Sequence, residues 1–328
     1  MRHKEIKVKP IKMIIDTDPG IDDVMAILFA HQHPNIDLLG LTTVIGNGTL
    51  ETVTRNALLL KKYFNLACDV AKGADKPLQG EAREEPTFVH GDNGLGNIEI
   101  DEKEDFGKID PRPACDYLID QIRANPNEIT LVAIGQLTNL ALAIEKAPDI
   151  IPLVKQVIIM GGAFGYNGHF GNVTPVAEAN IYGDPWAADK VLTAKWDVVI
   201  VGLDVTHQVI MKNEHFEQLK ENSQYGQFIY DISRFYLNFY KTKGLDNGCA
   251  VHDSSAIFYA LHPELFKTIK GPVRVVTEGI TKGQTVIKTS DFQFGIDEWK
   301  EMPHQTVCVD VDAQACLDLY QTTMCNCK

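Results

Sequence analysis

The chain is organised around the stretch Met13-Ile14-Ile15-Asp16-Thr17-Asp18-Pro19-Gly20-Ile21-Asp22-Asp23-Val24-Met25-Ala26-Ile27-Leu28. Its first apolar run predicts a buried strand, Asp-Pro-Gly predicts a sharp turn, and the apolar residues from position 24 onward indicate one face of a helix. In open α/β sheets, ligands gather beyond the carboxyl ends of the strands, where this turn is expected to lie. The stretch therefore predicts a junction of strand, turn and helix at a ligand site.

Four residues of this stretch are acidic: Asp16, Asp18, Asp22 and Asp23. Carboxylates crowded beside a buried strand repel one another and resist desolvation unless a positive group lies among them. Because the stretch offers oxygen ligands and no His or Cys, it favours Ca²⁺ or Mg²⁺ over zinc or copper. The alternative is that Asp18 caps the helix, with Pro19 at its first position, and that the later two acids only complement the helix dipole. Four acids together favour the metal site.

The composition sets limits on the class of protein. The chain has 328 residues, 45% hydrophobic and 23% charged, as expected of a globular protein with a substantial core. Its formal net charge of -13 argues against nucleic acid or an anionic membrane surface as a partner, since both require basic patches. The 7 cysteines have no framework spacing and predict free thiols. Residues 1–12 are basic and polar rather than a signal peptide or membrane span, so we expect a cytoplasmic protein.

Apolar runs and helical patterns alternate along most of the chain. We expect strands at residues 36–45, 69–71, 129–134, 154–160 and 198–203, and helices at 49–64, 114–124, 138–146, 185–194, 213–243, 252–261 and from 313 onward. This alternation predicts an α/β fold with a mainly parallel open sheet flanked by helices, as in Rossmann-like proteins. Later short runs predict a small peripheral β element near the C-terminus, at residues 273–277, 285–288 and 306–309. No repeat or linker divides the chain, so we expect one domain over residues 1–328.

Two histidines lie in segments that are candidates for a site. His90 lies in the long irregular segment 73–113, and such segments are usually functional or disordered. It is either a site residue or an exposed loop residue. His252 precedes Asp253 at the start of a helical pattern, so it either takes part in proton transfer or only orients its acidic neighbour.

Taken together, these motifs resemble the nucleoside hydrolases, calcium-dependent enzymes that cut the N-glycosidic bond of ribonucleosides. Residues 16–23 are similar to that family's N-terminal fingerprint at each acidic position. Further segments that agree in order and spacing are Gly46-Asn47 with Thr54-Arg55-Asn56-Ala57, Val89-His90-Gly91, Met160-Gly161-Gly162, Gly171-Asn172-Val173-Thr174-Pro175-Val176-Ala177-Glu178-Ala179-Asn180, and His252-Asp253. The resemblance covers nearly the whole chain.

The resemblance implies that Asp18, Asp23 and Asp253 bind Ca²⁺ through their carboxylates and Ile134 through its main-chain carbonyl. Some members have another side chain at position 134, which matters little for a backbone ligand. Because Ca²⁺ accepts about 6 to 8 oxygen ligands, the ribose diol can complete the shell, which explains selectivity for ribose over 2′-deoxyribose. Asp18 is also implied as general base for a calcium-bound water that attacks C1′ directly and inverts it.

The resemblance also implies residues that contact the substrate. The implied ribose contacts are Asp22, Asn47, Met160, Asn172, Glu178 and Asn180. The candidates for protonating the departing base are His252 and His90, with Tyr236 or Tyr240 able to join a relay. Ala179 stands where many members carry Phe, so the base preference stays open.

Two alternatives of other classes remain. An Asp-x-Asp pair after a first strand also occurs in Mg²⁺-dependent phosphohydrolases, but the chain has no Walker-type phosphate loop and no obvious lysine to clamp a phosphate. A non-catalytic nucleoside-binding sensor would not need the full set of Asp18, Asp23, His252 and Asp253. The resemblance implies a small ribonucleoside as partner and a homo-oligomer, a dimer or tetramer, to which the aromatic residues of 213–243 could supply an interface.

Overall fold

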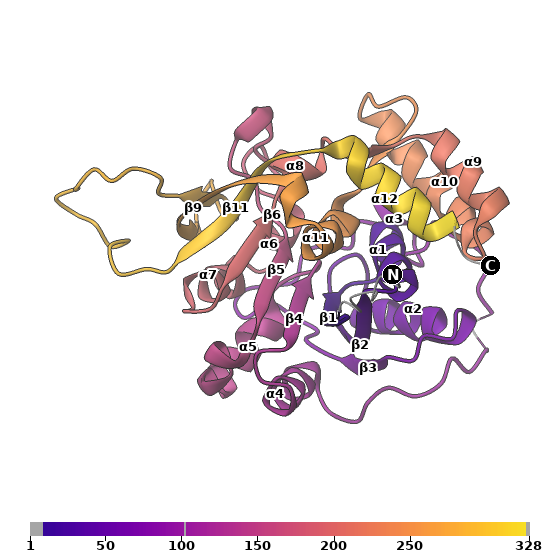
Figure 1. The fold of residues 1–328 in the computed structure, drawn as a ribbon, viewed down its shortest axis with the longest axis horizontal. Helices are drawn as coiled ribbons and strands as arrows, with labels where there is room; N and C mark the ends of the chain where they lie inside the picture. The colour runs from indigo at the N-terminus through magenta and orange to yellow at the C-terminus, as the bar shows by residue number, and fades with distance from the viewer. Residues whose placement is uncertain (1–8, 102, 326–328) are drawn as a thin grey trace, which may run out of the picture.

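The computed structural model describes residues 9–101 and 103–325. Its main sheet is built from β1 (Ile11–Thr17), β2 (Ile36–Thr43), β3 (Asp69–Lys72), β4 (Ile129–Ala133), β5 (Gln156–Met160), β6 (Val198–Val201), β9 (Phe266–Val275), β10 (Thr285–Ile287) and β11 (His304–Val311). These strands form one 9-stranded sheet in the order β10-β9-β11-β6-β5-β4-β1-β2-β3 (Figure 1). The pairs from β3 to β11 are parallel, whereas β9 pairs antiparallel with both β11 and β10.

Helices cover both faces of the sheet. They are α1 (Ile21–Gln32), α2 (Leu50–Tyr63), α3 (Thr87–His90), α4 (Ala114–Ala124), α5 (Thr138–Lys146), α6 (Ala179–Gly183), α7 (Pro185–Thr193), α8 (Leu203–Thr206), α9 (Asn213–Asn222), α10 (Gly226–Thr242), α11 (His252–Leu261) and α12 (Ala313–Cys325), with 3₁₀ turns at Pro148–Leu153, Tyr166–Gly168 and Pro263–Leu265. A separate short pair joins β7 (Ile210–Met211) to β8 (Cys249–Ala250). None of the described helices has both the length and the apolar character needed to cross a bilayer.

The side chains of β1 show why its sequence is apolar without alternation. Met13 and Ile15 pack into the core formed with α1, α10, α11 and α12, whereas Ile14 packs into the core formed with α4, α5 and α7. Successive side chains of a strand point to opposite faces, and both faces of this sheet are covered. From Met13 onward the strand is therefore buried on both sides, and its only acidic residue, Asp16, stands near its carboxyl end.

The strand order reverses at β1, which pairs with β2 on one side and with β4 on the other. The loops that follow β1 and β4 therefore leave toward opposite sides of the sheet, and the crevice between them is the expected ligand site of such a fold. Residues 18–20 follow β1 and Ile134 follows β4. The fold brings these two predicted positions together.

The predicted fold class is confirmed, including the small peripheral β element near the C-terminus. Its strands β11, β9 and β10 lie at one edge of the main sheet, where β11 pairs in parallel with β6 and the other two pairs are antiparallel. The expected helix 213–243 is two helices, α9 and α10, with a break at Ser223–Tyr225.

Candidate functional site

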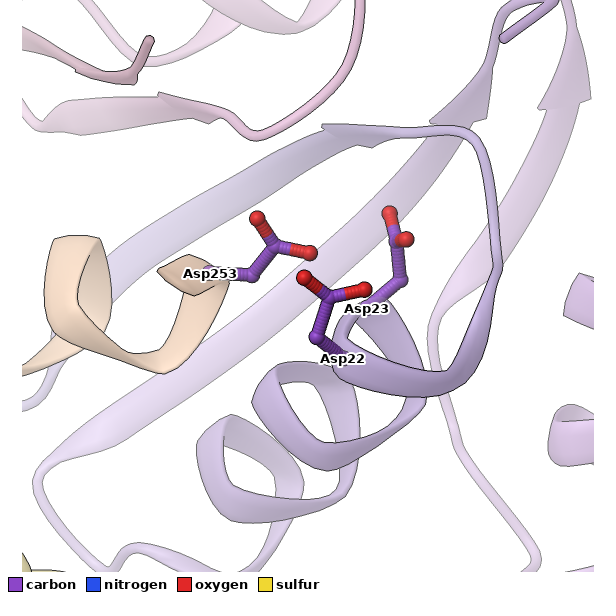
Figure 2. Close-up of side chains that lie close together, drawn as sticks. All are labelled: Asp22, Asp23 and Asp253. Atoms are coloured by element: carbon purple, nitrogen blue, oxygen red, sulfur yellow. The ribbon is translucent and has the colours of Figure 1, made fainter. Parts of the chain in front are cut away.

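Three aspartates from distant parts of the chain meet at the point where the strand order reverses. Asp22 and Asp23 project from the first turn of α1 and Asp253 from the first turn of α11 (Figure 2). One carboxylate oxygen from each lies within 4.8 Å of the others, and all three residues are buried. Asp23 and Asp253 form no salt bridge with a lysine or arginine of residues 9–101 and 103–325, whereas Asp22 Oδ1 lies 4.0 Å from His90 Nδ1. The cluster therefore lacks a compensating basic side chain.

Asp23 fixes the turn between β1 and α1. Its Oδ1 accepts hydrogen bonds from the Thr17 hydroxyl at 2.6 Å and from the Asp18 amide at 3.2 Å. Its Oδ2 accepts from the Gly20 amide at 3.0 Å and from Asn47 Nδ2 at 2.9 Å. Because α1 begins at Ile21 with Gly20 as its N-cap, Asp18 does not cap the helix, and that part of the alternative is wrong. Asp22 and Asp23 do lie in the first turn of α1, as the alternative also expected.

Asp18 is buried between two glycines and is only half satisfied. Its Oδ2 accepts a hydrogen bond from the Asn47 amide at 2.8 Å, whereas its Oδ1 has no partner among the described residues. A Cβ atom at Gly135 would lie 2.6 Å from Oδ1, and one at Gly46 would overlap Oδ2. Both positions must therefore be glycine to make room for the Asp18 carboxylate. Asp18 lies outside the group formed by Asp22, Asp23 and Asp253.

Asp16 does not belong to the cluster. Its Oδ2 accepts hydrogen bonds from the Thr42 hydroxyl on β2 and, at 2.8 Å, from Asn139 Nδ2 on α5. Burial raises the pKa of Asp16 to about 7. Asp16 therefore links β1 to β2 and α5 through hydrogen bonds. Of the acidic residues in residues 13–28, only Asp18, Asp22 and Asp23 lie at the site.

Burial is the main cause that raises the pKa of each carboxylate at the site. Burial, and next to it repulsion from the neighbouring Asp23, raise the pKa of Asp22 to about 7. For Asp253, burial comes first and repulsion from Asp22, Asp23 and Asp18 follows. The same cause raises the pKa of Asp18 and of Asp23. A cation among these groups would favour their ionised forms.

The predicted ribose contacts come from the ends of β2 and β5 and from the segment before α7. Asn180 Nδ2 donates to the Ile134 carbonyl at 2.8 Å and to the Met160 carbonyl at 3.1 Å, which links α6 to the ends of β4 and β5. The Glu178 carboxylate caps α6 by accepting from the amides of residues 180 and 181. Asn172 differs from the others, because it is exposed and its Oδ1 accepts from the Ala179 amide at 3.0 Å.

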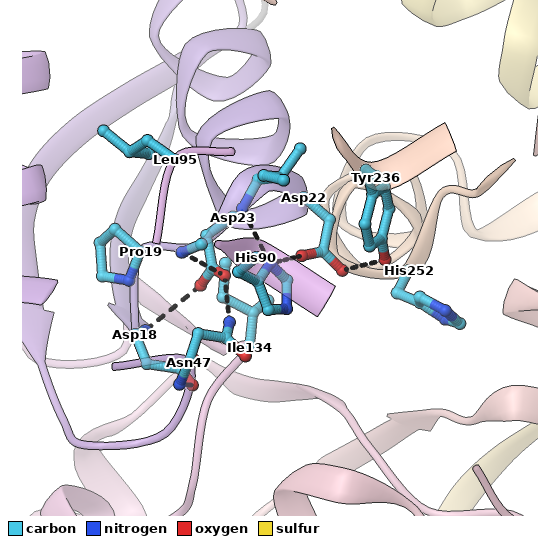
Figure 3. Close-up of polar contacts among 12 residues, drawn as sticks. Asp18, Pro19, Asp22, Asp23, Asn47, His90, Leu95, Ile134, Tyr236 and His252 are labelled. Carbon is cyan, nitrogen blue, oxygen red and sulfur yellow. Dashed lines mark hydrogen bonds and ion pairs between the residues drawn. The ribbon is translucent and has the colours of Figure 1, made fainter. Parts of the chain in front are cut away.

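His90 and Tyr236 lie beside the acidic cluster (Figure 3). The Tyr236 hydroxyl donates to Asp22 Oδ2 at 3.2 Å, and the ring of His90 stacks on Tyr236 with 5.7 Å between centroids. The Ile21 amide donates to His90 Nδ1 at 3.2 Å. Burial lowers the pKa of His90 to about 3, so its ring is neutral near pH 7. His90 is thus a buried site residue and not an exposed loop residue.

His252 is held by two hydroxyl groups. Its Nδ1 lies 2.8 Å from Thr206 Oγ1 and its Nε2 lies 2.6 Å from the Tyr240 hydroxyl. Burial lowers the pKa of His252 well below its usual value, and His207 and His90 lower it further. Thr206 was not anticipated from the sequence, although it follows the expected strand 198–203 by three residues. The Tyr240 hydroxyl therefore contacts Nε2 of His252, and the Thr206 hydroxyl contacts Nδ1.

Known proteins match this chain over nearly its whole length. The family model described as inosine-uridine preferring nucleoside hydrolase matches residues 13–318. "Probable uridine nucleosidase 2" of Arabidopsis thaliana is 41% identical over 312 residues, which cover 94% of this chain and 95% of the relative. The inosine-uridine preferring nucleoside hydrolase of Crithidia fasciculata is 38% identical, with 92% and 94% covered. The solved structure of the plant nucleoside hydrolase PpNRh1 superposes with a TM-score of 0.92 at 40% identity, covering 97% of this chain and 100% of that one. From the family match and these relatives, the chain belongs to the inosine-uridine preferring nucleoside hydrolases, enzymes that act on N-glycosyl compounds.

Proposed function

We propose that this enzyme hydrolyses the N-glycosidic bond of ribonucleosides to ribose and free base, with Ca²⁺ as cofactor, by direct attack of water with inversion at C1′. The observation that carries the proposal is the meeting of Asp22, Asp23 and Asp253, three buried carboxylates from the two ends of the chain. The names of the relatives, uridine nucleosidase and inosine-uridine preferring nucleoside hydrolase, support uridine and inosine as the first substrates to test.

The residues at the site fit a hard divalent cation. Oxygen atoms are the donors here, and Oδ1 of Asp18 and Oδ1 of Asp22 are buried without a hydrogen-bond partner among the described residues. Asp18, Asp23 and Asp253 would hold the ion through their carboxylates, and Ile134 through its carbonyl oxygen. That oxygen accepts one hydrogen bond from Asn180 and has a second lone pair for the ion. The ion, when bound, lowers the pKa of a water molecule and fixes the ribose diol.

Asp18 is the general base in this proposal. Its unpartnered Oδ1 takes the proton from the attacking water, while Asn47 holds Oδ2 in place. The transition state has oxocarbenium character, so a pocket lined by acidic oxygens stabilises it. Attack on the face opposite the base gives inversion.

The sugar is held by Asp22, Asn47, Met160, Asn172, Glu178 and Asn180. Asn180 is pre-oriented by its bonds to two strand-end carbonyls, and Glu178 by three backbone amides, those of residues 162, 180 and 181. Preorganised donors and acceptors of this kind lose little entropy when the substrate binds. Asn172 reaches the sugar from the exposed rim.

The leaving base receives its proton from the group of His90, Tyr236, Tyr240 and His252. Because both ring nitrogens of His252 already contact hydroxyl groups, its proton travels through the Tyr240 hydroxyl. The relay is neutral near pH 7 before the reaction, because burial lowers the pKa of both histidines and raises that of both tyrosines. The group that gives its proton to the departing base then recovers one from solvent water, and Asp18 releases the proton that it took from the attacking water.

A substrate panel with a reducing-sugar readout tests the proposal. Ribose release from at least one of inosine, adenosine, uridine and cytidine is expected, together with a much slower reaction of 2′-deoxyuridine, which lacks the 2′-hydroxyl and therefore has no vicinal diol. p-Nitrophenyl phosphate is assayed in parallel, as a substrate for the alternative phosphohydrolase activity. Phosphate release without ribose release would establish a phosphohydrolase, and nucleoside binding without ribose release would establish a sensor.

We further propose that the enzyme is a cytoplasmic homo-oligomer. The segment between β10 and β11 exposes Phe292, Phe294 and Ile296, and large exposed apolar side chains in one segment are typical of an interface. Light scattering coupled to size-exclusion chromatography measures the mass directly. A monomer at micromolar concentration would contradict this proposal.

A further inference from the structure

Three histidines that lie far apart in the sequence contact one another in turn. The rings of His207 and His252 meet edge to face, with 5.3 Å between their centroids and 62° between their planes. His207 Nδ1 also lies 3.0 Å from Nδ1 of His169, with 4.6 Å between those two ring centroids. His252 is buried, whereas His207 and His169 are half-buried. The contacts therefore lead from the buried His252 to a residue nearer the surface.

The contact between His169 and His207 is a hydrogen bond between two neutral rings. Burial, and next to it the neighbouring His169, lower the pKa of His207 to about 4. Burial also lowers the pKa of His169. Two neutral imidazoles can share a hydrogen bond when one Nδ1 carries a proton and the other does not. The pair thus holds complementary tautomers, and each ring fixes the orientation of the other.

The loop that carries His169 is anchored on α8, the short helix directly before His207. The Asp204 carboxylate on α8 accepts hydrogen bonds from the amide of Phe164 at 2.9 Å and from that of Tyr166 at 2.7 Å. The Gly165 amide donates to the His169 carbonyl at 3.0 Å, which closes the turn. These bonds hold the loop on α8, so the contact between the two histidines is built into the fold.

The two ends of this chain of contacts lie at different parts of the proposed site. Three residues after His169, the same loop reaches Asn172, the proposed sugar contact at the exposed rim. At the other end, His252 Nε2 lies 2.6 Å from the Tyr240 hydroxyl. Hydrogen bonds at both ring nitrogens leave rotation about the line between them weakly restrained, since the last torsion of a histidine is broad. A second ring packed against His252 restricts that rotation.

We propose that His207 and His169 are positioning residues for the leaving-group step: they link the loop that carries Asn172 to His252, and they hold the His252 ring where Nε2 meets the Tyr240 hydroxyl. This inference rests on the proposed function, in which the base receives its proton through His252 and Tyr240. Both histidines act through His252, and neither contacts the nucleoside.

The test measures kcat and KM for uridine and for p-nitrophenyl riboside, whose leaving group needs no proton. His207→Ala should lower kcat on uridine about 10-fold, with KM within about twofold of the wild type, because a misplaced proton donor slows the reaction without removing a substrate contact. Its kcat on p-nitrophenyl riboside should not change. His207→Phe keeps a ring against His252 and should recover part of the loss on uridine.

His169→Ala removes only the anchor of His207, so it should show the same pattern with a loss of about threefold. If His207→Ala does not fold, His169→Ala and His207→Phe decide the question. His304→Ala is the matched control, because His304 is exposed on β11 and takes no part in this chain of contacts. It should behave as the wild type on both substrates. Equal losses on the two substrates in His207→Ala, or no loss on uridine, would overturn the inference.

A double-mutant cycle tests the link to the sugar side of the site. The losses in kcat/KM on uridine caused by His169→Ala and Asn172→Ala should combine to less than their product, since the first change already releases the loop that carries Asn172. His304→Ala and Asn172→Ala should combine multiplicatively. Multiplicative losses in both pairs would overturn the link. A wild type that releases no ribose from either substrate would instead refute the proposed function itself.

Discussion

At the scale of single residues, the site depends on polar atoms that the protein leaves unsatisfied. Oδ1 of Asp18 and Oδ1 of Asp22 are buried without partners in the described part of the chain, whereas both oxygens of Asp23 accept two hydrogen bonds each. An orphaned carboxylate oxygen costs stability in the free protein, and the cost persists in native proteins mainly where a ligand or a reaction uses the group. Asp23 thus builds the turn in addition to its proposed role as a metal ligand, whereas Asp18 and Asp22 each keep one oxygen free for the ligand.

Asp18→Asn should abolish ribose release, with kcat falling about 100- to 10,000-fold, because the variant loses the general base. The amide keeps an oxygen for the Asn47 amide and removes one charge from a crowded cluster, so the melting temperature should not fall. Steady-state assays and thermal unfolding of the same preparation check both statements. Normal turnover would remove Asp18 from the mechanism.

His252→Ala should reduce kcat on uridine more than on p-nitrophenyl riboside, whose leaving group needs no proton. Thr206→Val should show the same pattern with a smaller loss, because the Thr206 hydroxyl only orients the ring through Nδ1. Equal losses on both substrates in either variant would assign that residue a structural role instead.

At the scale of elements, the site is assembled by the ends of parallel strands and the first turns of two helices. The sequence predicted the junction at residues 13–28 and the helix 114–124 with its observed bounds, because local periodicity and turn residues decide both. It did not predict that Ser223–Tyr225 interrupts 213–243, although the polar run 220–224 interrupts the apolar spacing there. Nor could it assign Asp16 to Thr42 and Asn139, because these contacts depend on strand register.

The structure brings predicted site residues together, but the group of three carboxylates differs from the predicted set of metal ligands. The sequence and the family resemblance named Asp23 and Asp253, which lie in one group, but that group also holds Asp22, which was expected at the sugar. Thr206 carries no local signal, because its importance comes from its contact with His252 across the fold and not from its neighbours in the chain.

Gly135→Ala tests the close approach between the end of β4 and the turn after β1. The added methyl group would lie 2.6 Å from Asp18 Oδ1 and 2.9 Å from a Val44 methyl group, so one of them must move. A displacement of about 1 Å at the general base should lower kcat/KM about 100-fold. Gly295→Ala is the control, since a Cβ atom added there would have no described atom within 4 Å, and it should leave activity unchanged. Equal activity of the two variants would contradict the steric argument.

At the scale of the whole molecule, the proposed cation would couple stability to its own binding at the buried carboxylates. Excess chelator should inactivate the enzyme, and Ca²⁺ at about 100 times its Kd should raise the melting temperature by about 5 °C relative to the chelated protein. Asp253→Asn should shrink this rise, because it removes one ligand. Full activity in excess chelator would refute the metal argument.

The raised pKa of Asp16 predicts how stability changes with pH. Its folded pKa of about 7 lies above the ordinary value of 3.8, so the folded state binds the proton more tightly than the unfolded state does. The resulting stability is complete below about pH 4 and is lost as the pH rises through about 7. Asp16→Asn cannot ionise, so its melting temperature should gain on that of the wild type as the pH rises from 4 to 8. A constant difference across that range would contradict the assignment.

The distance in sequence between α1 and α11 has a consequence for biosynthesis. A growing polypeptide that already contains β1 to β6 but has not reached residue 253 lacks one of the three carboxylates that converge at the crevice. The proposed metal site is therefore completed only when α11 docks onto α1, after most of the sheet has been synthesised. A truncated chain that ends before residue 253 would contain the acidic motif of residues 16–23 and yet have no hydrolase activity.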